Sequence, residues 1–172
     1  QRIESGLFSA FWDTGSTWDA RWINNVTYNL KNGISLDRSY NNEVRNNIAY
    51  EDDKSMYNQN DTYGLMVKET TVNGFHPWHG IYTKGGGFHI FRNNLWYSAR
   101  KSNYVRYMDP SQPAITVDAF NAQIGSKTEL AEDPLFENVD EYDFSLKAGS
   151  PAIGTGDGGV NRGAYAVYPK TD

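Results

Sequence analysis

The sequence predicts an all-β fold, the right-handed parallel β-helix, in which successive coils of about 22–24 residues stack into a solenoid. Three observations lead to this fold class. A short motif recurs along the chain, apolar residues between the turns alternate with the period of a strand, and Gly, Asn and Asp interrupt every such segment. Helical spacing of apolar residues is scarce, so a stack of short strands is expected in place of a helical array.

The recurring motif is a pair of asparagines flanked by apolar residues. It reads WINNVTY at Trp22–Tyr28, VRNNIAY at Val44–Tyr50 and FRNNLWY at Phe91–Tyr97. The pairs are separated by 22 and then by 47 residues, and the second interval is about two periods of 23. We therefore expect one coil between the first two motifs and two coils between the second and the third.

The asparagines have a structural role in such a stack. Consecutive coils lie about 4.8 Å apart, so a residue type that recurs at one position forms a column. A turn between two strands that needs a left-handed backbone favours Asn over other residues that carry a side chain. We expect each turn to use this property, and the side-chain amides to form hydrogen bonds from one coil to the next.

A longer repeat aligns Gly33–Tyr50 with Gly80–Tyr97 without a gap. Side chains alternate between the two faces of a strand, so every second residue of the aligned strands faces outward. In this alignment Asp37 and Lys84 share one outward-facing column, about two rungs or 9–10 Å apart. Arg106, on the next expected strand, comes near the same column.

The segments between turn residues predict the strands in order along the chain. The strands of the first two coils are Gly6–Phe11, Ala20–Trp22 and Val26–Tyr28, followed by Gly33–Asp37, Glu43–Arg45 and Ile48–Tyr50. Leu65–Lys68 is expected to be part of the second strand of the third coil. The fourth coil contains Gly80–Lys84, His89–Arg92 and Leu95–Tyr97, and Tyr104–Met108 begins a fifth. Loops are expected at Trp12–Asp19 and Glu51–Tyr63, and an asparagine turn at Asn73-Gly74.

The chain of 172 residues is expected to form a single domain. Residues 1–108 supply the stacked coils, residues 109–128 form an irregular loop with a short helix near Val117–Gln123, and residues 129–172 close the stack. The net charge of −5 argues against nucleic acid and anionic membranes as partners. There is no long apolar run, no segment that resembles a signal peptide and no cysteine, which excludes disulfides and thiolate sites.

The C-terminal stretch carries three short motifs, DPLF at Asp133–Phe136, DFSL at Asp143–Leu146 and GSPAI at Gly149–Ile153. Together they resemble the closing segment of the pectate-lyase-like superfamily of right-handed β-helix proteins, which cleave or bind polysaccharides. The resemblance implies an acidic glycan as the favoured partner. It also implies a secreted, periplasmic or cell-surface location.

Proteins of this superfamily usually cover the N-terminal edge of the solenoid, because an open strand edge invites pairing. Here Gly6 already enters a coil, and few coils follow for such a fold. We therefore expect the chain to be the C-terminal part of a longer β-helix. The N-terminal part would then be a separate chain, a cleaved piece or a symmetry partner.

Cleavage of a uronate polymer by β-elimination needs a base for the proton next to the carboxylate, and donors that stabilise the enolate. Lys84 is the candidate base, because the positive charge of Arg106 beside it would lower its pKa. His79, in the loop before this strand, is a further candidate acid or base. The resemblance implies that the substrate groove runs along this first sheet.

Candidate substrate-binding residues come from the loops before the strands and from the outward face of the first sheet. The loop FHPWHG contains His76 and Trp78, and the indole either stacks on a sugar ring or packs the loop against the core. The remaining candidates are the outward-facing Tyr82 and Asp37 and the basic pair of the next loop, Arg100 and Lys101, which suits an acidic sugar.

The loop Glu51–Tyr63 carries three aspartates, Asp52, Asp53 and Asp61, whose hard oxygen atoms suit Ca²⁺. They lack the spacing of an EF-hand, and a plain acidic surface loop explains them as well. Zinc is not expected, because two histidines of the FHPWHG loop have no third ligand near them. Ca²⁺ is therefore the one candidate cofactor.

Three functions remain open at this point. The first is a polysaccharide lyase or its C-terminal part, and the second is a non-catalytic carbohydrate-binding or cell-surface module. The third is a glycoside hydrolase, which needs two carboxylates across the bond, and Asp37 with Asp52 or Asp53 is the available set. Arg45 and Arg92 share a different outward column beside the asparagine turns and are expected to be structural.

Overall fold

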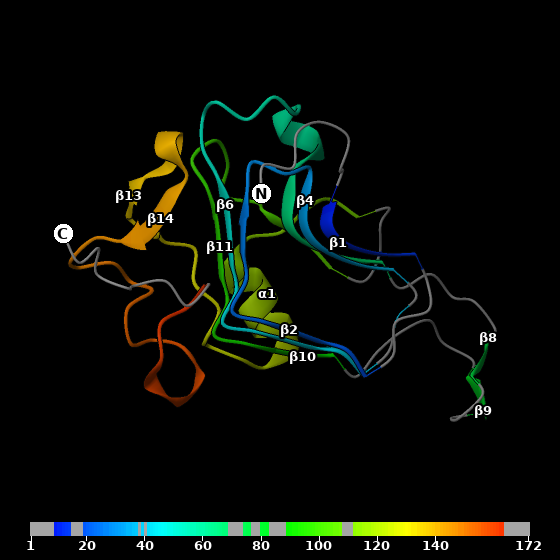
Figure 1. The fold of residues 1–172 in the computed structure, drawn as a ribbon. Coiled ribbons are helices and arrows are strands. Elements are labelled where there is room, and N and C mark those ends of the chain that lie inside the picture. Colours follow the sequence, from blue (N-terminus) through cyan, green and yellow to red (C-terminus); the bar gives the residue numbers. More distant parts are fainter. Residues whose placement is uncertain are drawn as a thin grey trace.

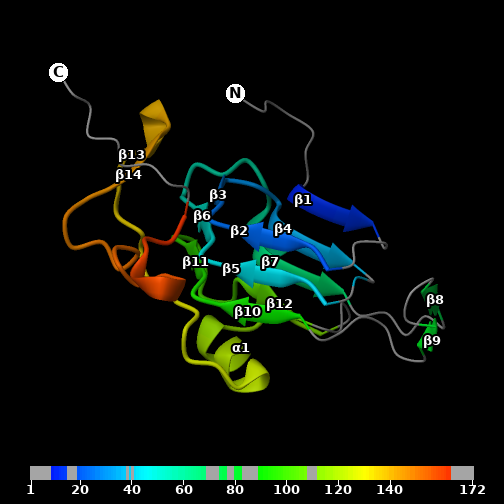
Figure 2. The same cartoon turned by 60° about the horizontal axis from the view of Figure 1, so that its bottom comes forward.

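The structure is a computed structural model that describes residues 9–14, 19–37, 39, 41–68, 74–76, 80–82, 89–107 and 112–163. This part of the chain is mostly β, with three parallel sheets, two antiparallel strand pairs and one α-helix. In Figure 1 the strands of each parallel sheet lie behind one another, and Figure 2 shows them stacked side by side. The predicted stacking of short strands is therefore present.

Each parallel sheet takes its strands from successive passes of the chain. The first sheet contains β1 (Ser9–Thr14), β4 (Asn32–Asp37), β7 (Tyr63–Lys68) and β12 (Val105–Arg106). The second contains β2 (Arg21–Ile23), β5 (Glu43–Arg45) and β10 (Ile90–Arg92), and the third contains β3 (Val26–Tyr28), β6 (Ile48–Glu51) and β11 (Leu95–Ser98). Each complete pass adds one strand to each sheet, which is compatible with a parallel β-helix-like fold.

The second interval between asparagine pairs is a single pass, so the prediction of two coils there is wrong. Val44 pairs directly with Phe91, and Ile48 pairs directly with Leu95. The surplus chain leaves the stack between β6 and β7 and again between β7 and β10. The turns recur, but the connections between the strands differ in length. The number of passes therefore cannot be calculated from the spacing of the motif.

The prediction that Gly80–Lys84 continues the first sheet is also wrong. β7 lies beside β4 instead, and Asp37 pairs with Lys68. Leu65 and Val67 of β7 are fully buried and supply the alternating apolar pair that packs beside β4. β7 is therefore the first strand of its pass, and not part of a second strand.

β8 (Gly74–His76) and β9 (Gly80–Tyr82) form one of the antiparallel pairs. In both views this pair lies apart from the three parallel sheets (Figures 1 and 2). Gly74 pairs with Tyr82, and His76 pairs with Gly80. The candidates His76 and Tyr82 are thus carried by this pair and not by the first sheet.

The main core lies between the three parallel sheets, as strand alternation predicts. It is built from fully buried apolar side chains of every sheet, among them Ile34, Leu36, Val44, Leu65, Val67 and Trp96. The helix α1 (Val117–Ile124) lies at the end of the stack next to β10 and β12 (Figure 2). It adds Val117 and Phe120 to the core, and it confirms the short helix expected there.

The ends of α1 follow from their sequence. The side chain of Thr116 accepts a hydrogen bond from the backbone N–H of Ala119, which caps the helix N-terminus. Gly125 ends the helix in the left-handed conformation, with φ 66°. Among the described residues, no helix is both long enough and apolar enough to span a membrane.

A second apolar cluster covers the outer face of the third sheet. Ile48 and Leu95 pack there against Phe136 and Ala152 of the closing segment. Beside them lies a column of stacked rings with centroids 5.8 and 5.6 Å apart, formed by Tyr28, Tyr50 and Tyr97. The antiparallel pair β13 (Phe136–Asn138) and β14 (Asp143–Leu146) lies outside this sheet (Figure 1) and covers the rings.

The asparagine pairs divide two tasks between them. The first residue of each pair has the predicted left-handed backbone, with φ of 57°, 56° and 56° at Asn24, Asn46 and Asn93. The second residue forms the ladder: the Asn25 amide donates to Asn47, and the Asn47 amide donates to Asn94, each at 2.9 Å. The backbone N–H groups of Asn25 and Asn47 donate to the same oxygens. The predicted amide ladder is confirmed.

The closing segment is attached to the asparagine turns by its last described residues. Arg162 donates to the carbonyl oxygen of Asn94 at 2.7 Å, and the backbone N–H of Gly163 donates to the carbonyl oxygen of Asn46. Gly163 has φ 85°, and a Cβ atom there would lie 2.9 Å from Cδ1 of Ile48. A residue with a side chain would therefore push this attachment away from the sheet.

The motifs of the C-terminal stretch make the turns of this segment. Asp133 accepts a hydrogen bond from the backbone N–H of Leu135, and Asp143 accepts one from Ser145. The hydroxyl of Ser150 donates to the carbonyl oxygen of Pro134 at 2.6 Å. The motif residues thus fix the shape of the segment.

Candidate functional site

A pocket of about 490 Å³ opens where the loop after β11 meets the first turn of α1. We call it the loop–helix pocket. It is lined by Trp96, Ser98, Ala99, Arg100, Lys101, Ser102, Thr116, Val117, Asp118 and Ala131. Its volume lies in the range of about 300–1,000 Å³ that is typical of small-molecule sites.

Arg100 is a predicted binding residue that the structure places in this pocket. Its guanidinium forms an ion pair with Glu51, whose side chain is 0% exposed, and donates to the carbonyl oxygen of Tyr57 at 2.9 Å. Glu51 also accepts a hydrogen bond from the hydroxyl of Ser98 at 2.6 Å. Through these contacts Arg100 holds the end of β6 and the loop after it against the loop that lines the pocket.

Lys101 is the second predicted binding residue in the pocket. Its ammonium donates to the carbonyl oxygens of Gln59 and Thr62. It also lies 4.7 Å from the ring centroid of Tyr63 and 5.7 Å from that of Tyr104, within reach of cation–π attraction. The ammonium is therefore held against the loop after β6 and the rings of Tyr63 and Tyr104.

Beneath the pocket lies a buried carboxyl group that the sequence did not suggest. Glu129 is 2% exposed and accepts hydrogen bonds from the indole N–H of Trp96 at 2.7 Å and from the side-chain amide of Asn94 at 3.0 Å. It is the last acceptor of the amide ladder. A signal for it exists, because Thr128-Glu129-Leu130 follows the pattern of Asn93-Asn94-Leu95, and Leu130 bridges to Leu95.

Stability is expected to fall as the pH rises through the titration of Glu129. Burial raises its pKa from 4.5 to about 7, against the opposing hydrogen bonds and the charge of Arg162. Between these values the folded chain binds a proton that the unfolded chain has released, so raising the pH costs about 3 kcal/mol of unfolding free energy. Urea unfolding at pH 5 and pH 8 should show this loss for the wild type relative to Glu129→Gln. An equal difference between the two proteins at both pH values would contradict it.

The candidate Arg106 lies in β12, in register with Met66 of β7. Its guanidinium carbon is 4.4 Å from the ring centroid of Tyr63, and its buried Nε atom has no hydrogen-bond partner among the described residues. The candidates Lys84, His79 and Trp78 lie outside the described residues.

The structure describes the side chains of two of the three aspartates that the sequence suggests for Ca²⁺, Asp52 and Asp53. Asp52 is buried, and it accepts hydrogen bonds from the phenol of Tyr28 at 2.6 Å and the amide of Asn29 at 2.7 Å. Asp53 is exposed, and Asp61 ends a short 3₁₀ turn. Among the described residues, no three His, Cys, Asp or Glu side chains converge where an ion could bind.

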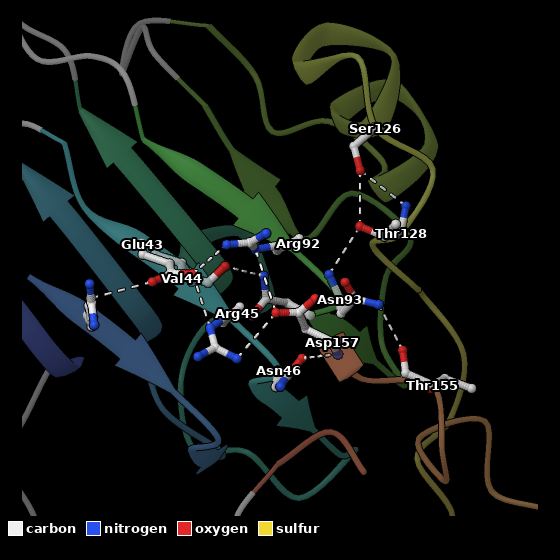
Figure 3. A network of polar contacts seen from close by, with 12 residues as sticks. Glu43, Val44, Arg45, Asn46, Arg92, Asn93, Ser126, Thr128, Thr155 and Asp157 are labelled. Atoms are coloured by element: carbon white, nitrogen blue, oxygen red, sulfur yellow. Dashed lines mark hydrogen bonds and ion pairs between the residues drawn. The ribbon is translucent and has the colours of Figure 1, made fainter. Parts of the chain in front are cut away.

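Arg45 and Arg92 share an outward column of the second sheet, in the role that the sequence predicts (Figure 3). Glu43 lies between them, with Oε1 3.0 Å from Arg45 and 2.7 Å from Arg92. The hydrogen bond from Arg92 lowers the pKa of Glu43. Asp157 of the closing segment lies 3.4 Å from Arg45, so these charges help to hold that segment in place.

The loop–helix pocket is therefore the candidate site, because its lining combines two cationic side chains with hydroxyl groups around a volume of about 490 Å³. It contains two of the predicted binding residues, and the sequence did not indicate its Thr116, Asp118 and Trp96. Comparisons with protein-family models, with curated proteins and with solved structures find none that matches this chain significantly.

Proposed function

We propose that this protein is a right-handed parallel β-helix of the pectate-lyase-like type that binds an acidic polysaccharide. The loop–helix pocket would hold one acidic sugar unit of the polymer. The observation that carries the proposal is the lining of the pocket, which includes Lys101 and Arg100 together with the hydroxyl-bearing residues Ser98, Ser102 and Thr116. Hydroxyl groups and fixed cations are the partners that the hydroxyl and carboxylate groups of a uronate need.

The geometry also explains how the pocket stays in shape without a ligand. The Arg100–Glu51 ion pair and the contacts of Lys101 fix both cations before a sugar arrives. A preorganised site loses less entropy when it binds, which favours affinity for a flexible polymer. Asp118 is the one lining side chain with an opposing charge, and it provides the sharpest test.

Asp118→Asn should tighten the binding of an acidic oligosaccharide about three- to fivefold, because a like charge leaves the pocket wall. Lys101→Gln should weaken binding by a similar factor for the opposite reason. Calorimetric titration with oligogalacturonate at low salt measures both changes, and added salt should reduce them. A neutral oligosaccharide of equal length is the control and should respond to neither substitution. Changes of the same sign in both variants, or no binding at any salt concentration, would reject the proposal.

Cleavage by β-elimination is the second candidate function. The observation that favours it is Arg106, whose buried Nε has no hydrogen-bond partner in the part of the chain that the structure describes and which lies on the sheet expected to face the substrate. Unsatisfied buried donors are uncommon and often belong to functional sites. Arg106 would then stabilise the enolate while Lys84 removes the proton.

Incubation with polygalacturonate or alginate tests this second candidate. A lyase creates an unsaturated sugar, so the ultraviolet absorbance of the mixture should rise with time. Arg106→Ala and Lys84→Ala should each abolish the rise, whereas Arg21→Ala, on an exposed position of the second sheet, should not. Binding without any rise in absorbance would leave a carbohydrate-binding module and exclude the lyase.

The resemblance of the C-terminal motifs to the pectate-lyase-like superfamily also leads us to propose a partner chain and a cellular location. An N-terminal part of the β-helix, as a separate chain, would pair with the edge formed by β1, β2 and β3. Each of these strands pairs on one side only within the described residues. A secreted or cell-surface location would bring the pocket to extracellular polysaccharides.

A further inference from the structure

We infer that Glu129 regulates the loop–helix pocket: when its carboxyl group gains a proton, the hydrogen bond that it accepts from Trp96 weakens, and the pocket wall that Trp96 forms changes. The consequence for saccharide binding rests on the function proposed above. The change in the pocket wall does not, and it can be measured without a ligand.

The first support is the set of contacts around the carboxyl group. Every hydrogen bond that Glu129 forms through its side chain is one that it accepts, from the indole N–H of Trp96 and from the amide and backbone N–H groups of Asn94. An indole N–H and a backbone N–H can only donate. A proton on Glu129 therefore finds no acceptor among these groups.

The amide of Asn94 could provide an acceptor only by turning over. Its oxygen already accepts hydrogen bonds from the backbone and side-chain amides of Asn47, both at 2.9 Å. Turning the amide would break the ladder between two passes of the chain. A neutral carboxyl group keeps an oxygen that accepts from Trp96, but this hydrogen bond loses the assistance of the negative charge, so we expect the contact with Trp96 to loosen.

The second support is the pattern of charges around the group. Arg162 of the closing segment is the charged residue that acts on Glu129, and Glu132 in turn acts on Arg162. β11 presents Trp96 to the carboxyl group and the turn before it presents Asn94, while α1 presents Asn121, which bonds to the backbone of Glu129. Burial outweighs the single cation and raises the pKa to about 7, so both states occur near neutral pH.

The third support is the direct connection to the pocket. Trp96, which donates to Glu129, and Ala131, two residues after Glu129, both line the pocket. Glu129 is also joined to α1, whose first turn lines the pocket as well, because its backbone bonds to Asn121 at 2.9 and 3.2 Å. A change at the carboxyl group therefore reaches two sides of the same cavity.

Nuclear magnetic resonance of the ¹⁵N-labelled chain tests the inference without a saccharide. Trp96→Phe identifies the indole signal of Trp96, and a titration from pH 5 to pH 9 should shift it with a midpoint near 7. The backbone amides of Ser98, Ser102 and Ala131 should follow with the same midpoint. An indole signal that does not shift, or amides that shift with a different midpoint, would overturn the inference.

Glu129→Gln keeps the size of the side chain and removes its titration, so these shifts should disappear. Asp118→Asn removes the carboxyl group that lines the pocket, and the shifts should persist. If the shifts persist in Glu129→Gln and vanish in Asp118→Asn, the inference is wrong.

With oligogalacturonate, wild-type affinity should be about threefold or more weaker at pH 5 than at pH 8, and Glu129→Gln should show no such difference. Failure to bind at either pH, with the indole shift present, would reject the proposed function alone.

Discussion

Replacing Asn94 with alanine is expected to lower the free energy of unfolding by about 4 kcal/mol, because several buried polar groups lose their partners at once. Its amide oxygen accepts from the backbone and side chain of Asn47, and its amide nitrogen donates to the carbonyl oxygen of Val44 at 2.8 Å and to Glu129. Asn94 is 0% exposed, so water cannot replace these bonds. Urea unfolding followed by circular dichroism measures the loss.

Asn25→Ala is the matched control at the other end of the ladder. Asn25 is only partly buried, and its amide donates to Asn47 and to the carbonyl oxygen of Ile23. Its removal should cost about 1 kcal/mol, because fewer groups are left unpaired and water reaches the site. Equal losses in the two variants would show that the ladder does not stabilise the stack through its interior hydrogen bonds.

Arg100→Ala should lower the free energy of unfolding by about 3–5 kcal/mol, because it leaves the carboxylate of Glu51 buried without its cation. Glu51 is 0% exposed, and its other partner is the neutral hydroxyl of Ser98. The variant should also free the loop after β6, which Arg100 holds through the carbonyl oxygen of Tyr57. Thermal and urea unfolding measure the first effect, and limited proteolysis of that loop measures the second.

The double variant Arg100→Ala with Glu51→Gln should recover most of the lost stability, since no buried charge remains. Arg21→Ala is the surface control: Arg21 is 75% exposed and lies 3.6 Å from Glu43, so its loss should cost less than about 1 kcal/mol. If the double variant is no more stable than Arg100→Ala, the missing packing of the arginine, and not the unpaired charge, causes the loss.

The sequence predicted the parts of the fold that depend on local chemistry. The asparagine pairs indicated both the left-handed turns at Asn24, Asn46 and Asn93 and the ladder between coils. β3 and β5 lie at the predicted residues, and α1 lies where a short helix was expected. These features depend on a few neighbouring residues, so a single sequence is enough to recognise them.

The number of passes could not be predicted in the same way. The gapless repeat of Gly33–Tyr50 and Gly80–Tyr97 is correct from Glu43 onward, where β5 pairs with β10 and β6 with β11. It is wrong before that point, because β7 competes for the place beside β4 and buries Leu65 and Val67 there. Which of two apolar segments pairs with β4 depends on packing across the core, and the local pattern of apolar residues does not reveal it.

Only part of the candidate site could be predicted. Arg100 and Lys101 were recognisable as a basic pair in a loop, and both line the pocket. Asp118 and Thr116 come from α1, and their place beside that loop follows from how the helix crosses the end of the stack. Glu129 stands at an asparagine position of the repeat, but its burial depends on the closing segment that brings Arg162 over it.

The passes of unequal length have a consequence for how this architecture can change. Val44 and Phe91 are 47 residues apart and Trp22 and Val44 are 22 apart, yet each interval adds one strand to the second sheet. The connections after β6 and β7 can therefore differ in length without changing the number of strands that are stacked in each sheet. Insertions or deletions in these two connections would therefore leave the pairing of the parallel strands unchanged.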